Sequence, residues 1–376
     1  MTFENLNLMK PLLDSVKREG YLTPTTIQYQ SIPHILSGKD LLGCAQTGTG
    51  KTAAFALPLL QLINRDKAAG IRPGIKALVL APTRELAFQI NECFRDYGKD
   101  TGVTSTCIYG GVPQNSQVSI LKQGVDVLIA TPGRLLDLIQ QQFVHLDCIR
   151  YFVLDEADRM LDMGFIDDIR KIISRLPAKK QTMLFSATIT ADIRKLAGKI
   201  MNQPVNISVT PEILAAGLVA QSVYYVKKEH KRQLLNHVIL NDAVDNALVF
   251  TRTKHGADKV ARDLNKNGIR AESMHGDKSQ NKREKTLNGF KNGIIKVLVA
   301  TDVASRGIDI DKLSHVINFE IPETPATYVH RIGRTGRAGT KGIALSFCSS
   351  DEKPYLVNIS KLIRKEINVV RIHPFS

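Results

Sequence analysis

The sequence predicts an α/β protein of two domains, each with a mainly parallel sheet flanked by helices. The chain has 376 residues, which is more than one hydrophobic core usually serves. Short runs rich in Val, Ile and Leu alternate with helix-like stretches, as they do in βαβ units. This alternation breaks once, around residues 208–220, and then resumes. Together these three observations favour two domains of similar build.

The first half opens with a helical stripe of apolar residues, Leu8, Leu12, Leu13 and Val16. Strand-like runs follow it along the chain. They are DLLGC (40–44), KALVLAP (76–82), DVLIATP (126–132), RYFVLDE (150–156), QTMLFSA (181–187) and VNISV (205–209). Because these runs are apolar almost throughout, they indicate strands of a parallel sheet that is buried on both faces.

A proline, a glycine and small residues interrupt the pattern at SVTPEILAAGLVAQ. We therefore expect an interdomain linker at 209–220, between a first domain at 1–208 and a second at 221–376. The strand-like runs of the second domain are QSVYYV (221–226), NALVFTR (246–252), IRAESMHG (269–276), IKVLVATD (295–302), SHVINFE (314–320) and GIALSFC (342–348). In such sheets ligands bind beyond the carboxyl ends of the strands, and most of the unusual residue clusters follow such an end.

The composition bounds the class of protein. The 51 basic and 36 acidic residues give a formal charge of +15, which solubility alone could explain but which favours a polyanionic partner such as nucleic acid. The five scattered cysteines form no C-x-x-C pair, so neither a zinc site nor a disulfide framework is indicated. No apolar run approaches the ~20 residues of a membrane helix, and the opening MTFENLNLMK lacks the regions of a signal peptide. We expect a cytoplasmic protein with no membrane partner.

A glycine-rich turn, AQTGTGKT, lies between the first strand-like run and an apolar helix-like stretch, which is the context of a phosphate-binding loop. Gly48 and Gly50 let the backbone curl so that N–H groups converge on phosphates, and the following helix adds its dipole. Lys51 supplies a point charge for the phosphates and Thr52 a hydroxyl for Mg²⁺. Ala45 stands where the usual pattern has its first glycine. The alternative, a turn with a chance Lys-Thr pair, is disfavoured by the context.

Carboxylates follow the apolar run YFVL. In a phosphate-loop enzyme the aspartate at the end of such a strand holds Mg²⁺, which is the role that Asp155 fits. Glu156 could polarise the attacking water as general base. The alternative for this pair is a helix N-terminal turn, where carboxylates are favourable in any case. Ser186 and Thr188 end another run, but hydroxyls cap helices in many proteins and say little alone.

Four motifs occur in one order along the chain: the phosphate-binding loop, DEAD (155–158), SAT (186–188) and HRIGRTGR (330–337). This set resembles the DEAD-box ATP-dependent RNA helicases of superfamily 2. The resemblance runs from Phe3 to about residue 350. It implies two tandem RecA-like domains with the active site in the interdomain cleft, ATP and Mg²⁺ as cofactors, and RNA as partner. The opening MTFENLNLMKPLL and the compact length look most like the bacterial RhlE-like subgroup.

The resemblance also implies nucleotide contacts. GYLTPTTIQ is similar to the family's Q motif, in which Gln28 reads the adenine edge and Tyr21 packs beside the base. Phe3 matches an isolated upstream aromatic, and Asp309 of ATDVASRGIDI, which resembles motif V, would hold the ribose hydroxyls. The implied nucleotide set is Phe3, Tyr21, Gln28, Thr47, Gly48, Thr49, Gly50, Lys51, Thr52, Gly307, Asp309, Arg334 and Arg337, with Thr52 and Asp155 for Mg²⁺.

Arg334 and Arg337 match the family's arginine fingers. A phosphoryl transition state carries charge on its equatorial oxygens, which a planar guanidinium reaches with two N–H groups. The residues alone leave an equal alternative, a basic loop that grips phosphate backbone. Ser186 and Thr188 are expected to couple the acidic strand end to domain closure through Asp158 and His330. The catalytic set is Lys51, Glu156, Asp158, Ser186, Thr188, His330, Arg334 and Arg337, and Asp162 is read as a solvated helix charge.

The segments APTRELA, YGG and ATPGR follow strands of the first domain, and VFTRT, QNKR and a Thr-Asp pair lie in the second. In the family such segments grip the sugar-phosphate backbone without reading bases. The RNA set is Pro82, Arg84, Gly110, Gly111, Thr131, Gly133, Arg134, Arg252, Arg283, Thr301 and Asp302. Aromatic residues make up 6% of the chain and tryptophan is absent, which agrees with sequence-tolerant binding. The preference for RNA comes from the resemblance.

Three functions are compatible with these residues. The first is an ATP-dependent RNA helicase that opens short duplexes or remodels ribonucleoprotein. The second is an ATP-gated RNA clamp or annealing factor with little unwinding. The third, a small-molecule phosphotransferase, would hydrolyse ATP without regard to RNA, and the basic charge argues against it. We expect a monomer. RhlE-like proteins often continue with a basic extension, whereas this sequence stops at VRIHPFS.

Overall fold

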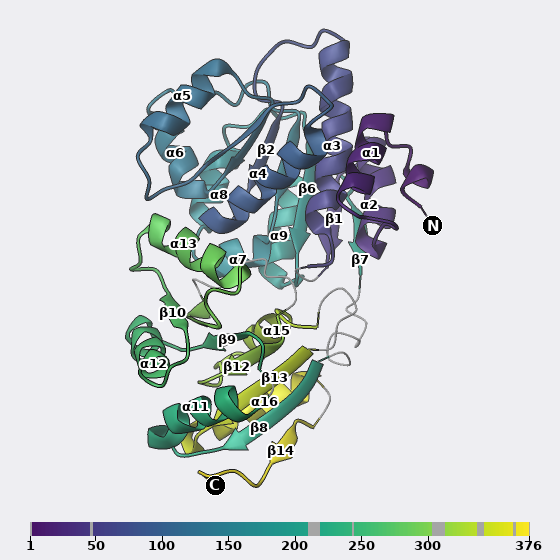
Figure 1. Cartoon of the computed structure of the whole chain (residues 1–376). Coiled ribbons are helices and arrows are strands. Elements are labelled where there is room, and N and C mark those ends of the chain that lie inside the picture. The colour runs from purple at the N-terminus through teal and green to yellow at the C-terminus, as the bar shows by residue number, and fades with distance from the viewer. Residues whose placement is uncertain are drawn as a thin grey trace. The chain divides into compact units, whose positions relative to one another are not determined.

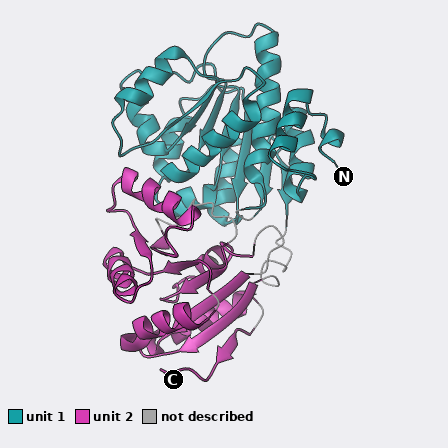
Figure 2. Ribbon diagram, in the orientation of Figure 1, with its two compact units in different colours: residues 1–211 teal, residues 212–376 magenta. Residues whose placement is uncertain are grey.

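Two compact units, residues 1–211 and 212–376, make up the chain (Figure 2). The structure, a computed structural model, describes residues 2–45, 48–209, 219–242, 244–302, 313–336, 342–363 and 366–375. Each unit contains one seven-stranded sheet, and the recorded strand pairings in both sheets are parallel. Helices flank both sheets (Figure 1). The predicted α/β class with two mainly parallel sheets is confirmed.

The first unit begins with helices and then alternates strands with helices. Its helical elements are η1 (Phe3–Leu6), α1 (Lys10–Arg18), α2 (Thr26–Leu36), α3 (Lys51–Ala68), α4 (Arg84–Gly98), α5 (Asn115–Gln123), α6 (Pro132–Gln140), α7 (Ala157–Asp162), α8 (Ile166–Ile173) and α9 (Ala191–Ile200). Its strands are β1 (Leu41–Cys44), β2 (Ala77–Leu80), β3 (Ser105–Ile108), β4 (Val127–Ala130), β5 (Tyr151–Leu154), β6 (Gln181–Ser186) and β7 (Val205–Ser208). The strand order is β3-β4-β2-β5-β6-β1-β7.

Two apolar cores cover the two faces of this sheet. On β2, Ala77 and Val79 pack in the core formed with α1 to α4, whereas Leu78 and Leu80 pack in the core formed with α5 to α9. Successive side chains of a strand point to opposite faces, so a strand covered on both sides must be apolar at every position. This is the physical reason why the runs in the sequence are continuous.

The second unit repeats the arrangement. Its helical elements are η2 (Lys228–His230), α11 (Lys231–Asn241), α12 (Lys254–Lys266), α13 (Gln280–Lys291), α15 (Pro325–Ile332), η3 (Ser350–Glu352) and α16 (Lys353–Ile363). Its strands are β8 (Val219–Tyr225), β9 (Ala247–Phe250), β10 (Ala271–Met274), β11 (Val297–Ala300), β12 (His315–Asn318), β13 (Gly342–Cys348) and β14 (Asn368–Val370). The order is β10-β11-β9-β12-β13-β8-β14. On β9, Ala247 and Val249 face the core with α11 and α12, and Leu248 and Phe250 face the core with α13.

Two details differ from the sequence prediction. Strand β8 begins at Val219, so the last two residues of the predicted linker belong to the second sheet; most of the rest, 210–218, lies outside the described residues. The edge strand β14 pairs with β8 and was not expected, because a run of three residues is too short to show a period. The predicted opening helix is confirmed as α1, with Leu12 and Val16 buried.

Candidate functional site

The carboxyl edge of the first sheet carries the candidate residues in two groups. β5, β6 and β1 are neighbours, and the acidic, Ser-Ala-Thr and glycine-rich segments follow them. β3, β4 and β2 are also neighbours, and the segments assigned to RNA follow these. Because parallel strands all end at one edge, the strand order places the segments predicted to bind nucleotide beside the segments predicted to bind RNA.

The glycine-rich loop leads into α3. Gly48 and Gly50 have φ of 83° and 87°, a left-handed conformation that favours glycine. Lys51 is the first residue of the helix, is 6% exposed, and donates from Nζ to the carbonyl oxygen of Ala45 at 2.8 Å. This bond points the ammonium back across the loop, where phosphate oxygens would lie against the helix N-terminus.

Gln28 ties the Q motif to this loop. Its amide nitrogen donates to the carbonyl oxygen of Gly50 at 3.1 Å, and its amide oxygen accepts from the backbone N–H of Thr25 at 2.9 Å. A Cβ atom at residue 50 would collide with the Gln28 amide. One amide hydrogen and one lone pair of Gln28 have no partner among the described residues, which is the donor and acceptor pair that an adenine edge needs.

The acidic strand end is buried. Asp155 is 2% exposed and its Oδ1 accepts from the backbone N–H of Glu156 at 2.9 Å. Glu156 occupies the left-handed region at φ 51°, is 6% exposed and forms an ion pair with Arg159 one turn along α7. Burial raises the pKa of Asp155 to about 6; Lys51 opposes this rise and the Glu156 charge adds to it. Arg159 was not singled out from the sequence, because an arginine inside a helix carries no motif signal.

Asp158 joins the DEAD and SAT segments directly. Its Oδ2 accepts from the backbone N–H of Thr188 at 2.9 Å and from the Thr188 hydroxyl at 2.8 Å. The Ser186 hydroxyl accepts from the backbone N–H of Asp158 at 3.3 Å and donates to the carbonyl oxygen of Thr188 at 2.8 Å. The structure therefore brings these three residues together, while their part in domain closure stays a prediction.

The two aromatic candidates differ in exposure. Phe3 is 4% exposed and packs in the core with α1 to α4. Tyr21 is 41% exposed, and its hydroxyl lies 3.3 Å from that of Tyr97. Tyr21 is thus partly exposed, as expected of a residue that packs beside a base, whereas Phe3 is a core residue.

The RNA segments of the first unit contact one another. The Arg84 guanidinium lies against the Cα of Gly111, which has φ of 75°, so any side chain at position 111 would displace it. Arg134 donates to the carbonyl oxygen of Val112 at 3.1 Å and to the Gln117 amide oxygen at 3.3 Å. Pro82, Gly110 and Thr131 lie in the turns after β2, β3 and β4, and Gly133 lies in the first turn of α6. Gln117 was missed from the sequence, since a single glutamine on a helix has no motif.

In the second unit several candidates are held by neighbouring side chains. Asp302 forms a two-pronged ion pair with Arg331, with both N–O distances 2.7 Å. The backbone N–H of Arg252 donates to Glu320 at 2.5 Å, and its guanidinium lies 3.6 Å from the carboxylate of Glu352. The Asp302 carboxylate is therefore held by Arg331, and its expected contact with RNA stays a prediction.

The remaining candidates are placed as follows. Thr49 lies between Gly48 and Gly50 in the glycine-rich turn, Thr52 lies in the first turn of α3, and Thr301 follows β11. Arg283 lies in the first turn of α13, His330 in α15 and Arg334 just beyond the end of α15. Thr47, Gly307, Asp309 and Arg337 lie outside the described residues.

Comparison with known proteins decides the family. A model described as DEAD/DEAH box helicase matches residues 25–196, and one described as helicase conserved C-terminal domain matches residues 230–339. The DEAD-box ATP-dependent RNA helicase CshA of Bacillus subtilis is 43% identical over 368 residues, which are 98% of this chain and 74% of CshA. The chain belongs to the DEAD/DEAH box helicase family.

Other relatives agree with this membership. The ATP-dependent RNA helicase CshA of Limosilactobacillus reuteri is 44% identical over 97% of this chain and 72% of its own length. Saccharomyces cerevisiae Dbp5 bound to RNA and ADP BeF3 has a TM-score of 0.88 at 33% identity, covering 98% of this chain and 95% of that one. The DEAD-box helicase Mss116 bound to ssRNA and UDP-BeF has a TM-score of 0.88 at 29% identity, covering 100% and 81%. The CshA matches support the DEAD-box family without singling out the RhlE-like subgroup.

The residues of this DEAD-box chain fit a magnesium ion that arrives with nucleotide. Within the described ranges, no group of three or more His, Cys, Asp or Glu side chains could hold a metal. Mg²⁺ is usually bound by one or two carboxylates and substrate phosphates instead of a full protein cage. The buried Asp155 carboxyl, whose pKa is raised, lacks sufficient positive charge nearby, which a divalent cation would supply. Thr52, in the first turn of α3, is the second residue predicted to hold this ion.

Asp155→Asn should stabilise the protein at pH 8 in the absence of Mg²⁺ and nucleotide. The pKa of Asp155 is raised from 3.8 in the unfolded chain to about 6 in the folded protein. The folded state therefore gains free energy from the protonated Asp155 below pH 3.8, and this gain is lost as the pH rises through about 6. Asparagine cannot ionise, so the variant should gain about 2–3 kcal/mol in unfolding free energy at pH 8 and little at pH 4. Urea unfolding with EDTA at both pH values measures this. Asp162→Asn, an exposed change at the end of α7, is the control, and a variant less stable than the parent at pH 8 contradicts the argument.

Proposed function

We infer that the chain is an ATP-dependent RNA helicase, which couples ATP binding and hydrolysis to RNA binding and to local opening of short duplexes or remodelling of ribonucleoprotein. The observation that carries this conclusion is the shared edge of the first sheet. Lys51, Asp155 and Glu156 follow one set of neighbouring strands and Arg84 and Arg134 another. An enzyme that hydrolyses ATP without regard to a polyanion has no use for the second set.

In the first unit each residue has a proposed task. Lys51 and the N–H groups of the loop bind the phosphates, and Gln28 and Tyr21 hold the base. Mg²⁺, when bound at Asp155 and Thr52, neutralises charge on the phosphates. Glu156 takes the proton of the attacking water. The Arg159 ion pair orients the Glu156 carboxylate, and the Asp158–Thr188 bond fixes the position of α7 against the SAT segment.

The second unit is proposed to complete the reaction. Arg334, and Arg337 beyond the described residues, would stabilise the charge that develops on the phosphoryl oxygens, which is worth about 10³–10⁵ in rate in related enzymes. The side chains of Arg84, Arg134 and Arg252 would contact the sugar-phosphate backbone and so hold the RNA strand. RNA and ATP would then each tighten the binding of the other by the same factor, since linkage is reciprocal.

The names of the relatives support this proposal. CshA is named an ATP-dependent RNA helicase, and the Dbp5 and Mss116 structures contain RNA. An ATP-gated RNA clamp uses the same residues, but the comparisons do not favour it. No helix in the described part of the chain combines the length and apolar character needed to cross a membrane. A cytoplasmic monomer, and membership of the RhlE-like subgroup, remain proposals based on the composition and on the opening segment.

ATP hydrolysis measured with and without single-stranded RNA tests the function, with DNA of the same sequence as control. We expect RNA to stimulate hydrolysis strongly, DNA to do so weakly, and a short RNA duplex to open in step with ATP consumption. Hydrolysis that ignores RNA would contradict the helicase and support a phosphotransferase. Hydrolysis that responds to RNA while duplexes stay intact would favour the clamp.

A further inference from the structure

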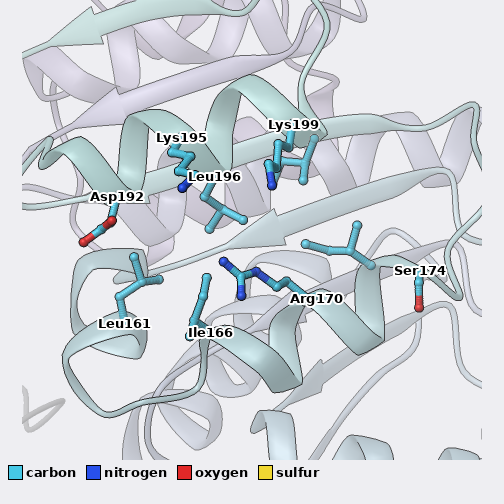
Figure 3. Close-up of a pocket in the computed structure, with 10 residues that line it drawn as sticks. Leu161, Ile166, Arg170, Ser174, Asp192, Lys195, Leu196 and Lys199 are labelled. Carbon is cyan, nitrogen blue, oxygen red and sulfur yellow. The ribbon is translucent and has the colours of Figure 1, made fainter.

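A cavity of about 450 Å³ lies in the first unit, lined by none of the residues assigned to ATP or RNA. It is formed by the end of α7 and by one face each of α8 and α9 (Figure 3). A volume between about 300 and 1,000 Å³ is typical of ligand sites in proteins. We call this cavity the α8–α9 groove.

The floor of the α8–α9 groove is apolar. Its apolar residues are Leu161, Ile166, Ile173, Leu196 and Ile200. Four of them remain partly exposed, and only Leu196 is buried. On α8, Ile166 and Ile173 are seven residues apart, and on α9, Leu196 and Ile200 are four apart, so each pair lies on one helix face. Two helices with facing apolar stripes and an open groove leave space for a third helix between them.

The rim of the α8–α9 groove is mainly positive. Arg170, Lys195 and Lys199 line it, together with one carboxylate, Asp192, near the start of α9 (Figure 3). Arg170 pairs with Asp167 at 2.9 Å. Lys195 and Lys199 are exposed, stand one turn apart on α9, and form no ion pair with any described residue. Both ammonium groups lie on the α9 side of the apolar residues, so an occupant that matches the charge and the apolar surface together is acidic and amphipathic.

We propose that the α8–α9 groove binds an acidic amphipathic helix of a partner protein. Apolar residues at i, i+3 or i+4 and i+7 of such a helix would enter the groove, and acidic residues beside them would meet Lys195 and Lys199. The eight residues of α8 offer about 12 Å of groove, enough for two turns of helix. Nucleic acid is a poorer occupant, because a charged sugar-phosphate backbone offers no apolar surface to cover the apolar floor.

The place of the groove gives the interaction a consequence. Leu161 belongs to α7, which also contains Asp158, and α9 begins directly after Thr190, two residues beyond Thr188. An occupant therefore contacts the two helices that continue from the bonded DEAD and SAT segments without touching either motif. The interaction goes beyond the proposed function and does not depend on it.

The test uses two fluorescein-labelled helical peptides of about 20 residues, because isolated helices shorter than about 12–15 residues are only marginally stable in water. Both carry leucine at i, i+3, i+7 and i+10; one has glutamate at the flanking positions and the other has lysine. Fluorescence anisotropy with the full chain should show binding of the acidic peptide alone. The double variant Lys195→Glu/Lys199→Glu should weaken this binding by about tenfold or more and should bind the basic peptide instead. Lys39→Glu, an exposed change elsewhere in the unit, should alter neither result.

Each other outcome contradicts the proposal. If the acidic peptide does not bind at millimolar concentration, or binds the double variant equally well, the groove does not select an acidic helix. If leucine-to-serine changes in the acidic peptide leave its affinity unchanged, the apolar floor is not used. If the double variant weakens binding of single-stranded RNA but not of the peptide, the two lysines belong to an RNA surface. Unchanged thermal unfolding of the variant confirms that it is folded in each case.

Discussion

Glu156→Gln should lower the rate of RNA-stimulated ATP hydrolysis by about 10²–10⁴-fold, while ATP and RNA still bind. The change keeps the size of the side chain and removes the carboxylate that would accept the proton of the attacking water. The binding residues Lys51 and Gln28 contact other atoms and are not altered. Turnover is measured with saturating RNA and ATP, and the two affinities are measured separately by titration with fluorescent analogues.

A second effect of this variant must be separated from the first. Glu156 pairs with Arg159 within the buried start of α7, so glutamine also removes the charge that faces this arginine. The free energy of unfolding of the variant is therefore measured together with its rate of ATP hydrolysis. The matched control is Asp162→Asn, an exposed carboxylate at the end of the same helix, which should leave turnover unchanged. Retained turnover in Glu156→Gln would remove Glu156 from the role of base.

Glu352→Leu should destabilise the second unit by about 3–5 kcal/mol, because it leaves a buried ammonium group without its counter-charge. Glu352 Oε2 accepts from Lys231 Nζ at 2.5 Å, and the two side chains are 4% and 2% exposed. The same carboxylate accepts from the backbone N–H groups of Ile321 and Ser349, at 3.1 and 3.0 Å. It thus joins segments that follow β12 and β13 to the start of α11.

Hydrogen exchange of the backbone amides, measured by mass spectrometry on the full chain, shows which segments lose stability in Glu352→Leu. Peptides from β8, β12 and β13 should exchange faster, and peptides from the first unit should not change. Glu229→Leu, an exposed change in η2, is the control. Removing both charges with Lys231→Met/Glu352→Leu should restore much of the protection, since a buried ion pair can be exchanged for apolar groups at little cost. If Glu352→Leu lowers the free energy of unfolding of the second unit by less than about 1 kcal/mol, Lys231 finds another partner.

Much of the candidate site could be predicted from the sequence, because each motif lies within a short stretch of the chain. The phosphate-binding loop needs only a strand, two glycines with positive φ and a helix N-terminus within a dozen residues, and Gly48, Gly50 and Lys51 have this arrangement. The carboxylates at 155–158 follow β5, a strand whose residues are all apolar and buried, so its end can be located from the sequence. Gln28, Tyr21 and Phe3 were found only by resemblance, since a lone glutamine or aromatic has no period or spacing to read.

The contacts between motifs could not be read in this way. Asp158 meets Thr188 across 30 positions, and Lys231 meets Glu352 across 121. Both contacts depend on which strands are neighbours, and the alternation of strands and helices is compatible with many strand orders. The ion pair of Asp302 with Arg331 likewise joins residues 29 positions apart.

Continuous apolar runs were enough to determine two parallel α/β units and the positions of polar residues after their strands, because a strand buried on both faces must be apolar at every position. Only the tertiary structure decided which of those strand ends are adjacent. The order β3-β4-β2-β5-β6-β1-β7 sets the strand ends of the predicted nucleotide segments beside those of the predicted RNA segments. That order is chosen by the packing of whole faces against one another, a cooperative property that no short stretch of sequence carries.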